Sequence, residues 1–387
     1  MKIALVHDWL TGMRGGEKVL LDLVRLFPRA DVFSLVWERG SVNAEIEARV
    51  RQVSFLQSLP LAKRLYRYCL PLFPAAVRSL DLTGYDLVIS SSHAVAKGAR
   101  IPAGAVHVSY IHTPMRYLWE NRKDYFQFGR GRWWKRASIA MIRPYLRRFD
   151  RQTAAGVDFF LANSENVRKR IRNVYGAEAR VISPPVDTRF FTPCECCARP
   201  GDYYLVVSSL EPYKRIDLVV DAFSGGTRKL LIAGKGTQER ELRARARSPV
   251  EFLGQVSDER LLELYRHSRA LIFPGLEDFG MVPVEAQACG RPVVCYGAGG
   301  ALETVIEGRT GVHFRPQTCE ALIAGVIRLE SMEWDSQLIR RHSLTFSRQV
   351  FRDRMIEFLQ AELPLLRILD EHCHTDEPEL RSVGGMA

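Results

Sequence analysis

Two glutamates separated by seven residues lie at a strand–loop–helix junction in the second half of the chain. The apolar run at residues 271–273 predicts a buried parallel strand, and the loop after it carries Glu277. Pro283 suits the first turn of the helix that follows, because a helix start does not use the N–H group that proline lacks. Glu285 lies on that helix, which we expect to end near Gly290.

This junction predicts a site for a phosphorylated ligand. Free backbone N–H groups and the positive end of the helix dipole favour an anion there by ~0.3–1 kcal/mol when the site is exposed. The carboxylates of Glu277 and Glu285 would repel a phosphate. We therefore expect them to accept hydrogen bonds from hydroxyls that flank a diphosphate, on a sugar at one side and a ribose at the other. The alternative is a solvated loop acid and a helix-surface acid.

The segment EDFGMVPVEAQACGRPVV, residues 277–294, is followed by a Gly-rich turn. It resembles the E-x7-E signature of retaining, nucleotide-sugar-dependent glycosyltransferases of family 4, among them bacterial mannosyltransferases of O-antigen and exopolysaccharide assembly. The resemblance implies that Glu285 holds the donor ribose and that Glu277 contacts the donor sugar. It also implies that the sugar–diphosphate site is lined by backbone amides around Phe279, Gly280, Met281 and Val282.

Two segments in the first half of the chain directly follow predicted strands, and they carry further candidate site residues. Gly15 and Gly16 follow the first predicted strand in the spacing GxxGG, which differs from the dinucleotide fingerprint GxGxxG and disfavours NAD binding. A tight strand–helix turn is the alternative explanation for these glycines. His112 ends another predicted strand, at the sheet edge where open α/β sheets bind ligands, although a histidine there can be an ordinary loop residue. The resemblance implies that the glycines face an interdomain cleft, near the donor phosphate or the acceptor, and that His112 lies beside the transferred sugar.

The segment SSLEPYKR, residues 208–215, resembles the family segment in which an arginine and a lysine clamp the diphosphate. Lys214 matches the lysine, whereas Ser209 stands where the arginine is expected, and Arg215 or Arg14 are candidates to replace it. The resemblance implies a front-face mechanism in which the leaving diphosphate takes the proton of the acceptor. The protein then mainly supplies positive charge and N–H donors to the departing phosphate, so we expect no metal ion and no cofactor besides the donor. We expect His112, Lys214 and Glu277 to be the catalytic residues.

Predicted strands and helices alternate along the chain, which favours doubly wound parallel sheets. The resemblance implies an α/β protein of the GT-B fold, with two Rossmann-like domains facing across a cleft and a C-terminal helix crossing back to the first domain. We expect an acceptor domain at residues 1–188, a linker at 189–201, a nucleotide-sugar domain at 202–345, the return helix at 346–370 and a disordered tail at 371–387. Residues 303–306 and 308–314 are expected to be the last strands of the second sheet.

The net charge of +11 is unevenly distributed, because residues 100–180 hold 17 Lys and Arg against 6 Asp and Glu, an excess of 11. No nucleic-acid-binding motif accompanies this charge. Trp133 and Trp134 lie among these cations, a combination that a membrane interface favours, although a loop whose tryptophans cover the core is an equal alternative. No signal peptide or transmembrane segment is recognisable, so we expect a cytoplasmic protein, peripheral on the inner face of the membrane.

The cysteines of the Cys194, Cys196 and Cys197 cluster are expected to be reduced thiols in the linker.

The resemblance implies a retaining glycosyltransferase that moves a hexose, with mannose from GDP-mannose as the best guess, and the basic segment with its tryptophans favours a lipid-linked glycan as the acceptor. Two alternatives remain from the sequence. One is a non-catalytic protein of the same fold that binds anionic polymers through its basic segment, and the other is a sugar-nucleotide epimerase of GT-B fold. The substitution at Ser209 favours the non-catalytic alternative, whereas the intact pair of Glu277 and Glu285 favours the enzyme.

Overall fold

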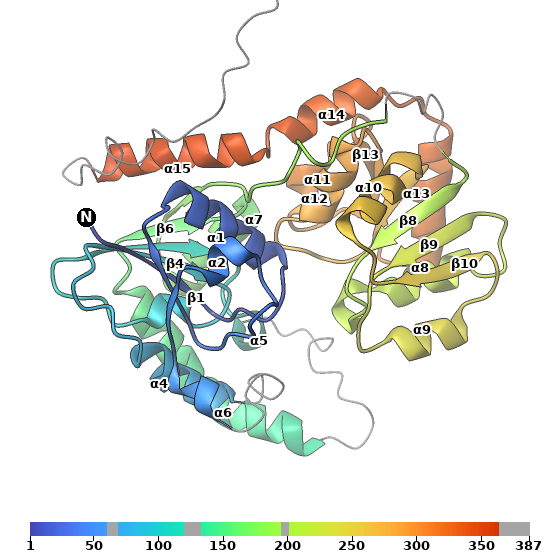
Figure 1. Ribbon diagram of the computed structural model, residues 1–387. Helices are drawn as coiled ribbons and strands as arrows, with labels where there is room; N and C mark the ends of the chain where they lie inside the picture. The colour runs from blue at the N-terminus through green and yellow to red at the C-terminus, as the bar shows by residue number, and fades with distance from the viewer. Residues whose placement is uncertain (60–68, 120–132, 195–200, 364–387) are drawn as a thin grey trace, which may run out of the picture.

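A computed structural model describes residues 1–59, 69–119, 133–194 and 201–363. Within these residues the strands form two parallel sheets, one of seven strands and one of six, in the two halves of the chain (Figure 1). The expectations for the tail at residues 371–387, for Cys196 and for Cys197 lie outside the described residues. Cys194 forms a disulfide, so the expectation of reduced thiols is wrong at this position.

The first sheet has the strand order β3-β2-β1-β4-β5-β6-β7, with every pair parallel. Its order reverses between β1 and β4, which is the point where open α/β sheets bind ligands. Its strands are β1 (Ile3–His7), β2 (Asp31–Ser34), β3 (Val50–Val53), β4 (Leu87–Ser92), β5 (Val106–Ile111), β6 (Phe159–Ala162) and β7 (Ala179–Val181). The helices of this half are α1 (Gly15–Leu26), α2 (Ala44–Glu47), α4 (Phe73–Arg78), α5 (Arg116–Trp119), α6 (Trp133–Ala154) and α7 (Glu165–Tyr175).

The second sheet repeats this arrangement, with the order β10-β9-β8-β11-β12-β13 and its reversal between β8 and β11. Its strands are β8 (Tyr203–Val207), β9 (Lys229–Ala233), β10 (Val250–Gly254), β11 (Ala270–Phe273), β12 (Val293–Tyr296) and β13 (Gly311–Phe314). Its helices are α8 (Ile216–Phe223), α9 (Glu239–Arg245), α10 (Asp258–His267), α11 (Met281–Ala288), α12 (Ala301–Thr304) and α13 (Cys319–Glu330). The expected strand at residues 303–306 is wrong, because residues 301–304 form α12.

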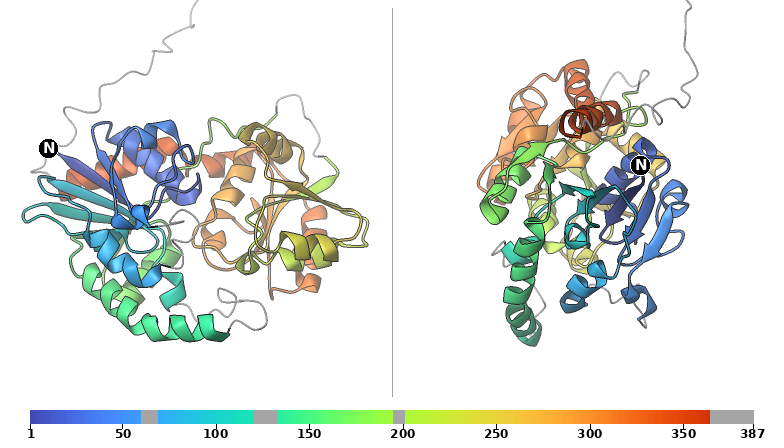
Figure 2. Two further views of the ribbon diagram at one scale, coloured as in Figure 1. Left: turned by 60° about the horizontal axis from the view of Figure 1, so that its bottom comes forward. Right: turned by 90° about the vertical axis from the view of Figure 1, so that its left-hand side faces the viewer.

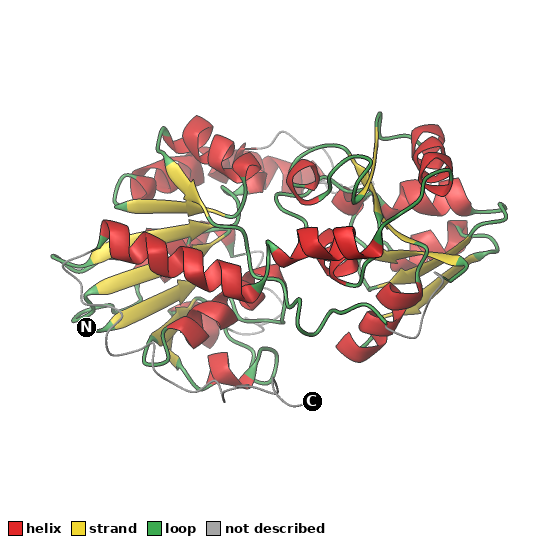
Figure 3. Ribbon diagram, turned by 90° about the horizontal axis from the view of Figure 1, so that it is seen from above, coloured by secondary structure: helices red, strands yellow, loops and turns green. Residues whose placement is uncertain are grey.

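The chain then returns to the first domain, as expected. Helix α14 (Ser336–Leu344) contacts α11, and α15 (Arg348–Glu362) lies across the first sheet (Figures 1 and 3). Its apolar side chains are buried in the core formed by β1, α1 and β4; they are Phe351, Met355, Phe358 and Leu359. The two domains with this return helix are the predicted GT-B architecture, and Figure 2 shows the two sheets side by side.

Candidate active site

The strand ends at the two crossover points bring polar side chains together between the domains. In the first sheet, β1 ends at His7 and β4 places Ser91 beside it. In the second sheet, the turn after β8 carries Lys214, and the loop after β11 carries Glu277. Because parallel strands present their carboxyl ends at one edge, both sheets offer their ligand-binding edge to the interface.

Glu277 is held between cations of both domains. Lys214 of the second domain forms an ion pair with it, and Nη2 of Arg116 from the first domain lies 3.9 Å from its Oε2. Burial alone would lower the pKa of Lys214, but the Glu277 carboxylate and the nearby Tyr213 together raise that pKa above its usual value. Lys214 is therefore charged at neutral pH, and it lies close to one of the two glutamates of the signature.

Asp278 attaches the same loop to the first domain. Its carboxylate accepts hydrogen bonds from Arg116 Nε at 2.8 Å and from Arg170 Nη1 at 2.6 Å. Its backbone carbonyl accepts a hydrogen bond from the Ser164 hydroxyl at 2.7 Å. Burial would raise the pKa of Asp278, but the two arginines hold it below its usual value. None of these four residues is recognisable from the sequence as part of the site, because Asp278 is more than 100 positions away from each of its partners in the chain.

A second contact across the interface involves α12. The carboxylate of Glu303 accepts hydrogen bonds from the backbone N–H groups of Glu165 at 2.7 Å and of Asn166 at 2.9 Å. These amides open α7, so a side chain of the second domain caps a helix of the first. We call Asp278 and Glu303, with Arg116, Arg170 and the start of α7, the interdomain latch.

Glu285 also reaches the first domain. Its Oε1 accepts a hydrogen bond from Lys18 Nζ at 2.8 Å, and its Oε2 accepts one from the Tyr265 hydroxyl at 3.0 Å. The carboxylate is buried, and its charge raises the pKa of Lys18. Both carboxylate oxygens therefore have donors, and a ribose that binds Glu285 must share or displace the Lys18 contact.

The start of α11 provides the free amides that the sequence predicts. Gly280 precedes the helix with a φ of +94°, a conformation that favours glycine, and no side chain caps the helix. In the described part of the chain, the N–H groups of Met281 and Val282 have no recorded acceptor. The side chain of Phe279 does not face a ligand, since it is buried against Phe346 with ring centroids 5.5 Å apart. Only backbone groups of residues 279–282 are thus available to an anion.

The Gly-rich turn after β12 packs against the loop that carries Glu277. The N–H of Gly300 donates to the carbonyl of Glu277 at 2.9 Å. A Cβ atom at Gly299 would lie 2.4 Å from that carbonyl oxygen, and one at Gly300 would lie 2.4 Å from the Phe279 Cα. Side chains at these two positions would therefore push the signature loop out of place.

Gly15 and Gly16 lie at the start of α1, which faces the second domain. A Cβ atom at Gly15 would lie 3.3 Å from the sulfur of Met281, and one at Gly16 would lie 3.3 Å from the His7 ring. The starts of α1 and α11 are therefore neighbours, and their positive ends converge. The backbone N–H of Arg14, just before α1, is already bound by the Glu17 carboxylate at 3.1 Å.

His112 lies on the first-domain side of the interface, and its Nε2 is 2.8 Å from the Ser91 hydroxyl. Burial holds the pKa of His112 well below its usual value, and the neighbouring His93 and His7 lower it further. The ring is therefore neutral at physiological pH. Its carbonyl accepts a hydrogen bond from Asn163 at 3.0 Å, which fixes the segment after β5.

Arg215 has partners outside this group of residues. Its guanidinium hydrogen-bonds Asp217 and Gln317, each at 3.2 Å, and Arg215 has a left-handed backbone conformation with a φ of 56°. Ser209 is exposed on the turn after β8. The structure thus brings Lys214, Glu277, Glu285, His112 and the starts of α1 and α11 to one interface, but it gives Arg215 other partners.

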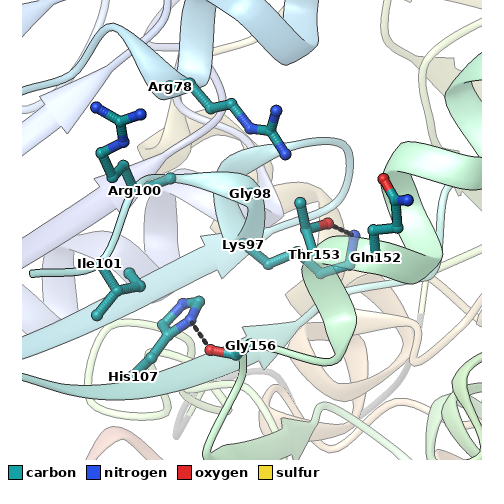
Figure 4. A pocket seen from close by; sticks show the side chains of 10 residues that line it. Arg78, Lys97, Gly98, Arg100, Ile101, His107, Gln152, Thr153 and Gly156 are labelled. Carbon is teal, nitrogen blue, oxygen red and sulfur yellow. Dashed lines mark hydrogen bonds between the residues drawn. The ribbon is translucent and has the colours of Figure 1, made fainter. Parts of the chain in front are cut away.

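A separate pocket of 410 Å³ lies in the first domain (Figure 4). It surrounds His107 at the beginning of β5, whereas His112 follows the other end of that strand. The pocket is lined by Arg78, Lys97, Gly98, Ala99, Arg100, Ile101, His107, Gln152, Thr153 and Gly156. It is not part of the interface described above.

Some arginines of the basic segment, residues 100–180, have a structural role. Arg143 and Arg147 both donate hydrogen bonds to the carbonyl of Leu118, and the guanidinium groups of Arg147 and Arg151 lie 4.8 Å from the Trp119 ring centroid. Arg148 is exposed on α6. Trp133 and Trp134 open α6, and their side chains are not described.

Comparison with known proteins finds a family model that is similar to each half of the chain. Residues 13–190 match the model described as Glycosyltransferase Family 4, and residues 199–344 match that of Glycosyl transferases group 1. A D-inositol 3-phosphate glycosyltransferase of Acidothermus cellulolyticus is 32% identical over 189 residues, which cover 41% of this chain and 42% of that protein. A glycogen synthase of Mycobacterium tuberculosis is 39% identical over 184 residues, or 44% of each chain. The chain spans less than half the length of these curated relatives.

Solved structures resemble the whole architecture. HepE of Anabaena, in complex with UDP and glucose, superposes with a TM-score of 0.68 and 18% identity, covering 92% of this chain and 99% of that one. At this identity the likeness shows the shared fold alone.

Proposed function

We propose that this chain, which joins a glycosyltransferase family 4 domain to a glycosyl transferases group 1 domain, transfers a hexose from a nucleotide-diphosphate sugar to a glycan acceptor. The observation that carries the proposal is the convergence of the α11 start, the α1 start and Lys214 beside Glu277 and Glu285. A diphosphate at the start of α11 would accept hydrogen bonds from free backbone amides and would lie near positive charge. The carboxylates of Glu277 and Glu285 would accept hydrogen bonds from hydroxyls of the donor sugar and its ribose.

The chemistry follows from where charge develops. As the bond between the sugar and the diphosphate breaks, negative charge grows on the leaving phosphate. Lys214 and the amides of Met281 and Val282 would stabilise that charge, which is the largest contribution to many such reactions. Lys214 would exchange its partner Glu277 for the phosphate, and Glu277 would become free to accept a hydroxyl of the sugar. This proposal requires no metal ion.

The nature of the donor is a further part of the proposal. HepE binds UDP and UDP-glucose, which supports a nucleotide-sugar donor in general. GDP-mannose stays our prediction for this chain. Thermal-shift measurements with GDP-mannose, UDP-glucose and ADP-glucose test it, and we expect the largest stabilisation from GDP-mannose. Equal stabilisation by all three, or none, would contradict the donor assignment.

We further propose a lipid-linked acceptor and a position on the cytoplasmic face of an anionic membrane. In the described residues, no helix is long and apolar enough to cross a membrane. One face of α6 nevertheless exposes Met141 and Tyr145, whose exposed fractions are 80% and 52%, together with Arg148. Large apolar side chains beside cations suit the boundary between headgroups and acyl chains. Helix α6 runs along the lower edge of the first domain in Figure 1.

A further inference from the structure

The pocket around His107 lies at the edge of the first sheet opposite to the candidate active site. His107 is the second residue of β5, whereas the active-site edge follows the last residue of this strand, Ile111. A strand of six residues spans about 20 Å, so the pocket is roughly one strand length away from the groups that would hold the donor. The pocket therefore needs an explanation of its own.

Two arginines supply the charge of this pocket. Arg78 ends α4, Arg100 follows the short 3-10 helix η4 (Ala96–Gly98), and both residues are exposed. Figure 4 shows the two guanidinium groups above the ring of His107. Within the described residues neither arginine has a carboxylate partner, and none of the ten residues that line the pocket is Asp or Glu.

The other titratable groups of the pocket add no net charge. Lys97 forms an ion pair with the buried carboxylate of Asp150. Burial lowers the pKa of His107 to about 4, so its ring is neutral at physiological pH. Asp158 lies near this histidine, but its carboxylate accepts the backbone N–H of His107 at 2.8 Å and does not line the pocket. The lining as a whole is therefore positive.

Hydrogen-bond donors reach the pocket from three segments of the chain. The Arg78 guanidinium rests over the Phe149 ring, with its Cζ 5.1 Å from the ring centroid, and this contact restrains the side chain while its N–H groups stay available. Arg100 enters from the segment after η4. Gln152 of α6 also lines the pocket, and its side-chain amide has no recorded partner in the part of the chain that the structure describes.

We propose that this pocket binds the phosphate group of a phosphate ester. Guanidinium groups bind phosphate through paired N–H donors, and the amide of Gln152 can add one more. The volume of 410 Å³ is typical of small-molecule sites and exceeds what a phosphate alone would fill, which leaves room for the esterified group beside Ile101. Such an ester is a soluble compound or the headgroup of a membrane lipid.

The place of Gln152 on α6 favours the lipid as the source. Gln152 follows Met141 by eleven residues and Tyr145 by seven, and at 3.6 residues per turn these three side chains lie within about 40° of one another around the helix. Met141 and Tyr145 form the exposed face of α6 that we propose to contact a membrane, and Gln152 continues this face into the pocket. Only the choice of a lipid rests on the proposed membrane contact. The phosphate site itself rests neither on that contact nor on the proposed transfer reaction.

Glycerol 3-phosphate is a suitable soluble probe, with glycerol as its uncharged control. The full chain, labelled with 15N-arginine, is titrated with each compound, and the variants Arg78→Gln and Arg100→Gln assign the two Nε–H signals. We expect both signals to shift with glycerol 3-phosphate and neither to shift with glycerol. In each single variant, the signal of the remaining arginine should need about tenfold more glycerol 3-phosphate for the same shift. Arg100→Gln leaves the contact between Arg78 and Phe149 in place, so it tests the site without disturbing the core.

The double variant Arg29→Gln/Arg51→Gln is the matched control. Both residues are exposed arginines of the first domain, and β3, which contains Arg51, is separated from β5 by three strands. This control should leave the titration of the Arg78 and Arg100 signals unchanged. Signals that do not shift with glycerol 3-phosphate, or an equal loss of affinity in the control, would overturn the proposal.

Vesicles of phosphatidylcholine and phosphatidic acid distinguish the two sources of the phosphate. At low salt, Arg78→Gln/Arg100→Gln should bind these vesicles about tenfold more weakly than Arg29→Gln/Arg51→Gln, although both double variants remove the same charge. Equal binding of the two double variants to the vesicles, with the glycerol 3-phosphate shifts retained in the wild type, would assign the pocket to a soluble phosphate ester.

Discussion

At the scale of single residues, Glu285 is the clearest test of the nucleotide site. Its carboxylate is buried with donors on both oxygens, from Lys18 and Tyr265. If it also binds the ribose, Glu285→Ala should weaken binding of the sugar-free nucleotide by ~1.5–3 kcal/mol, the range for hydrogen bonds to a charged group. Titration calorimetry measures this. Tyr265→Phe is the control, because it removes one supporting hydrogen bond and keeps the carboxylate. Unchanged nucleotide affinity in a folded Glu285→Ala protein would remove the ribose assignment.

Lys214 should affect the rate more than binding. Its positive charge is needed most when the diphosphate departs, so Lys214→Ala should lower turnover by about 10²-fold and change the Michaelis constant of the donor much less. Steady-state kinetics separate the two effects. Lys229→Ala is a suitable control, because Lys229 pairs with Glu251 on the surface at 3.3 Å. An effect of Lys214→Ala confined to the Michaelis constant would make Lys214 a residue that binds the ground state. In the same assay, Ser209→Arg tests whether the lost arginine can be restored.

At the scale of elements, the interdomain latch holds the signature loop against the first domain. Asp278→Asn leaves Arg116 and Arg170 without their carboxylate, and breaking a buried pair of this kind costs about 3–5 kcal/mol. We expect the domains to separate more easily, which small-angle X-ray scattering would record as a larger radius of gyration. Glu357→Gln is the control, since the Arg180–Glu357 pair is exposed and attaches α15 to the first sheet, away from the interface between the domains. An unchanged radius in Asp278→Asn would show that other contacts keep the domains closed.

The pH dependence of the latch has a definite sign. The pKa of Asp278 is lowered in the folded protein, so its stabilising contribution is fully present above about 3.9, the usual value in unfolded chains. That contribution is lost only when the pH falls through the lowered folded value. The difference in radius between wild type and Asp278→Asn should therefore be the same at pH 5 and pH 8. A difference that disappears at pH 5 would mean that this carboxylate is not held by the arginines.

Helix α6 is the element that should contact a membrane. Anionic vesicles should sediment the protein at low salt, and binding should weaken as salt screens the ~1 kcal/mol that each cation near the surface gains. Much of this membrane binding should be lost in the double variant Trp133→Ala/Trp134→Ala and in the variant Met141→Ala. Both variants should still bind the nucleotide-sugar donor. Arg143→Ala is expected to lower stability instead, because Arg143 holds the Leu118 carbonyl. Wild-type protein that stays in the supernatant at low salt would favour a soluble acceptor.

At the scale of the whole molecule, much of the fold follows from local sequence. Buried strands such as β8 and β11 are continuous apolar runs, and parallel pairing with alternating helices leaves few other arrangements. The strands β2 and β3 were not recognised, and residues 50–53 at the sheet edge include Arg51 and Gln52. Residues 303–306 have the composition of a strand, but Glu303 instead belongs to α12 and reaches the amides of α7.

The sequence predicted only those parts of the candidate site whose residues lie close together in one segment of the chain. Glu277, Glu285 and the start of α11 lie within one segment, so their spacing indicates a shared role. The latch depends on residues such as Arg116 and Asp278, which meet only when the two domains pack together. His7 and Ser91 are also far apart in sequence, and they meet because β1 pairs with β4 within the first sheet. No local pattern in the sequence indicates that Lys18 pairs with Glu285 or that Arg215 hydrogen-bonds Asp217.

The central claim is that the interface between the domains breaks the bond between a sugar and a nucleoside diphosphate. Release of free nucleotide from the nucleotide sugar that stabilises the protein most, measured without an acceptor, tests it most directly. We expect slow, continuous release by the wild-type protein, and release reduced about 10²-fold in Lys214→Ala. Tight binding of the nucleotide sugar without release, or release that Lys214→Ala leaves unchanged, would contradict the proposal.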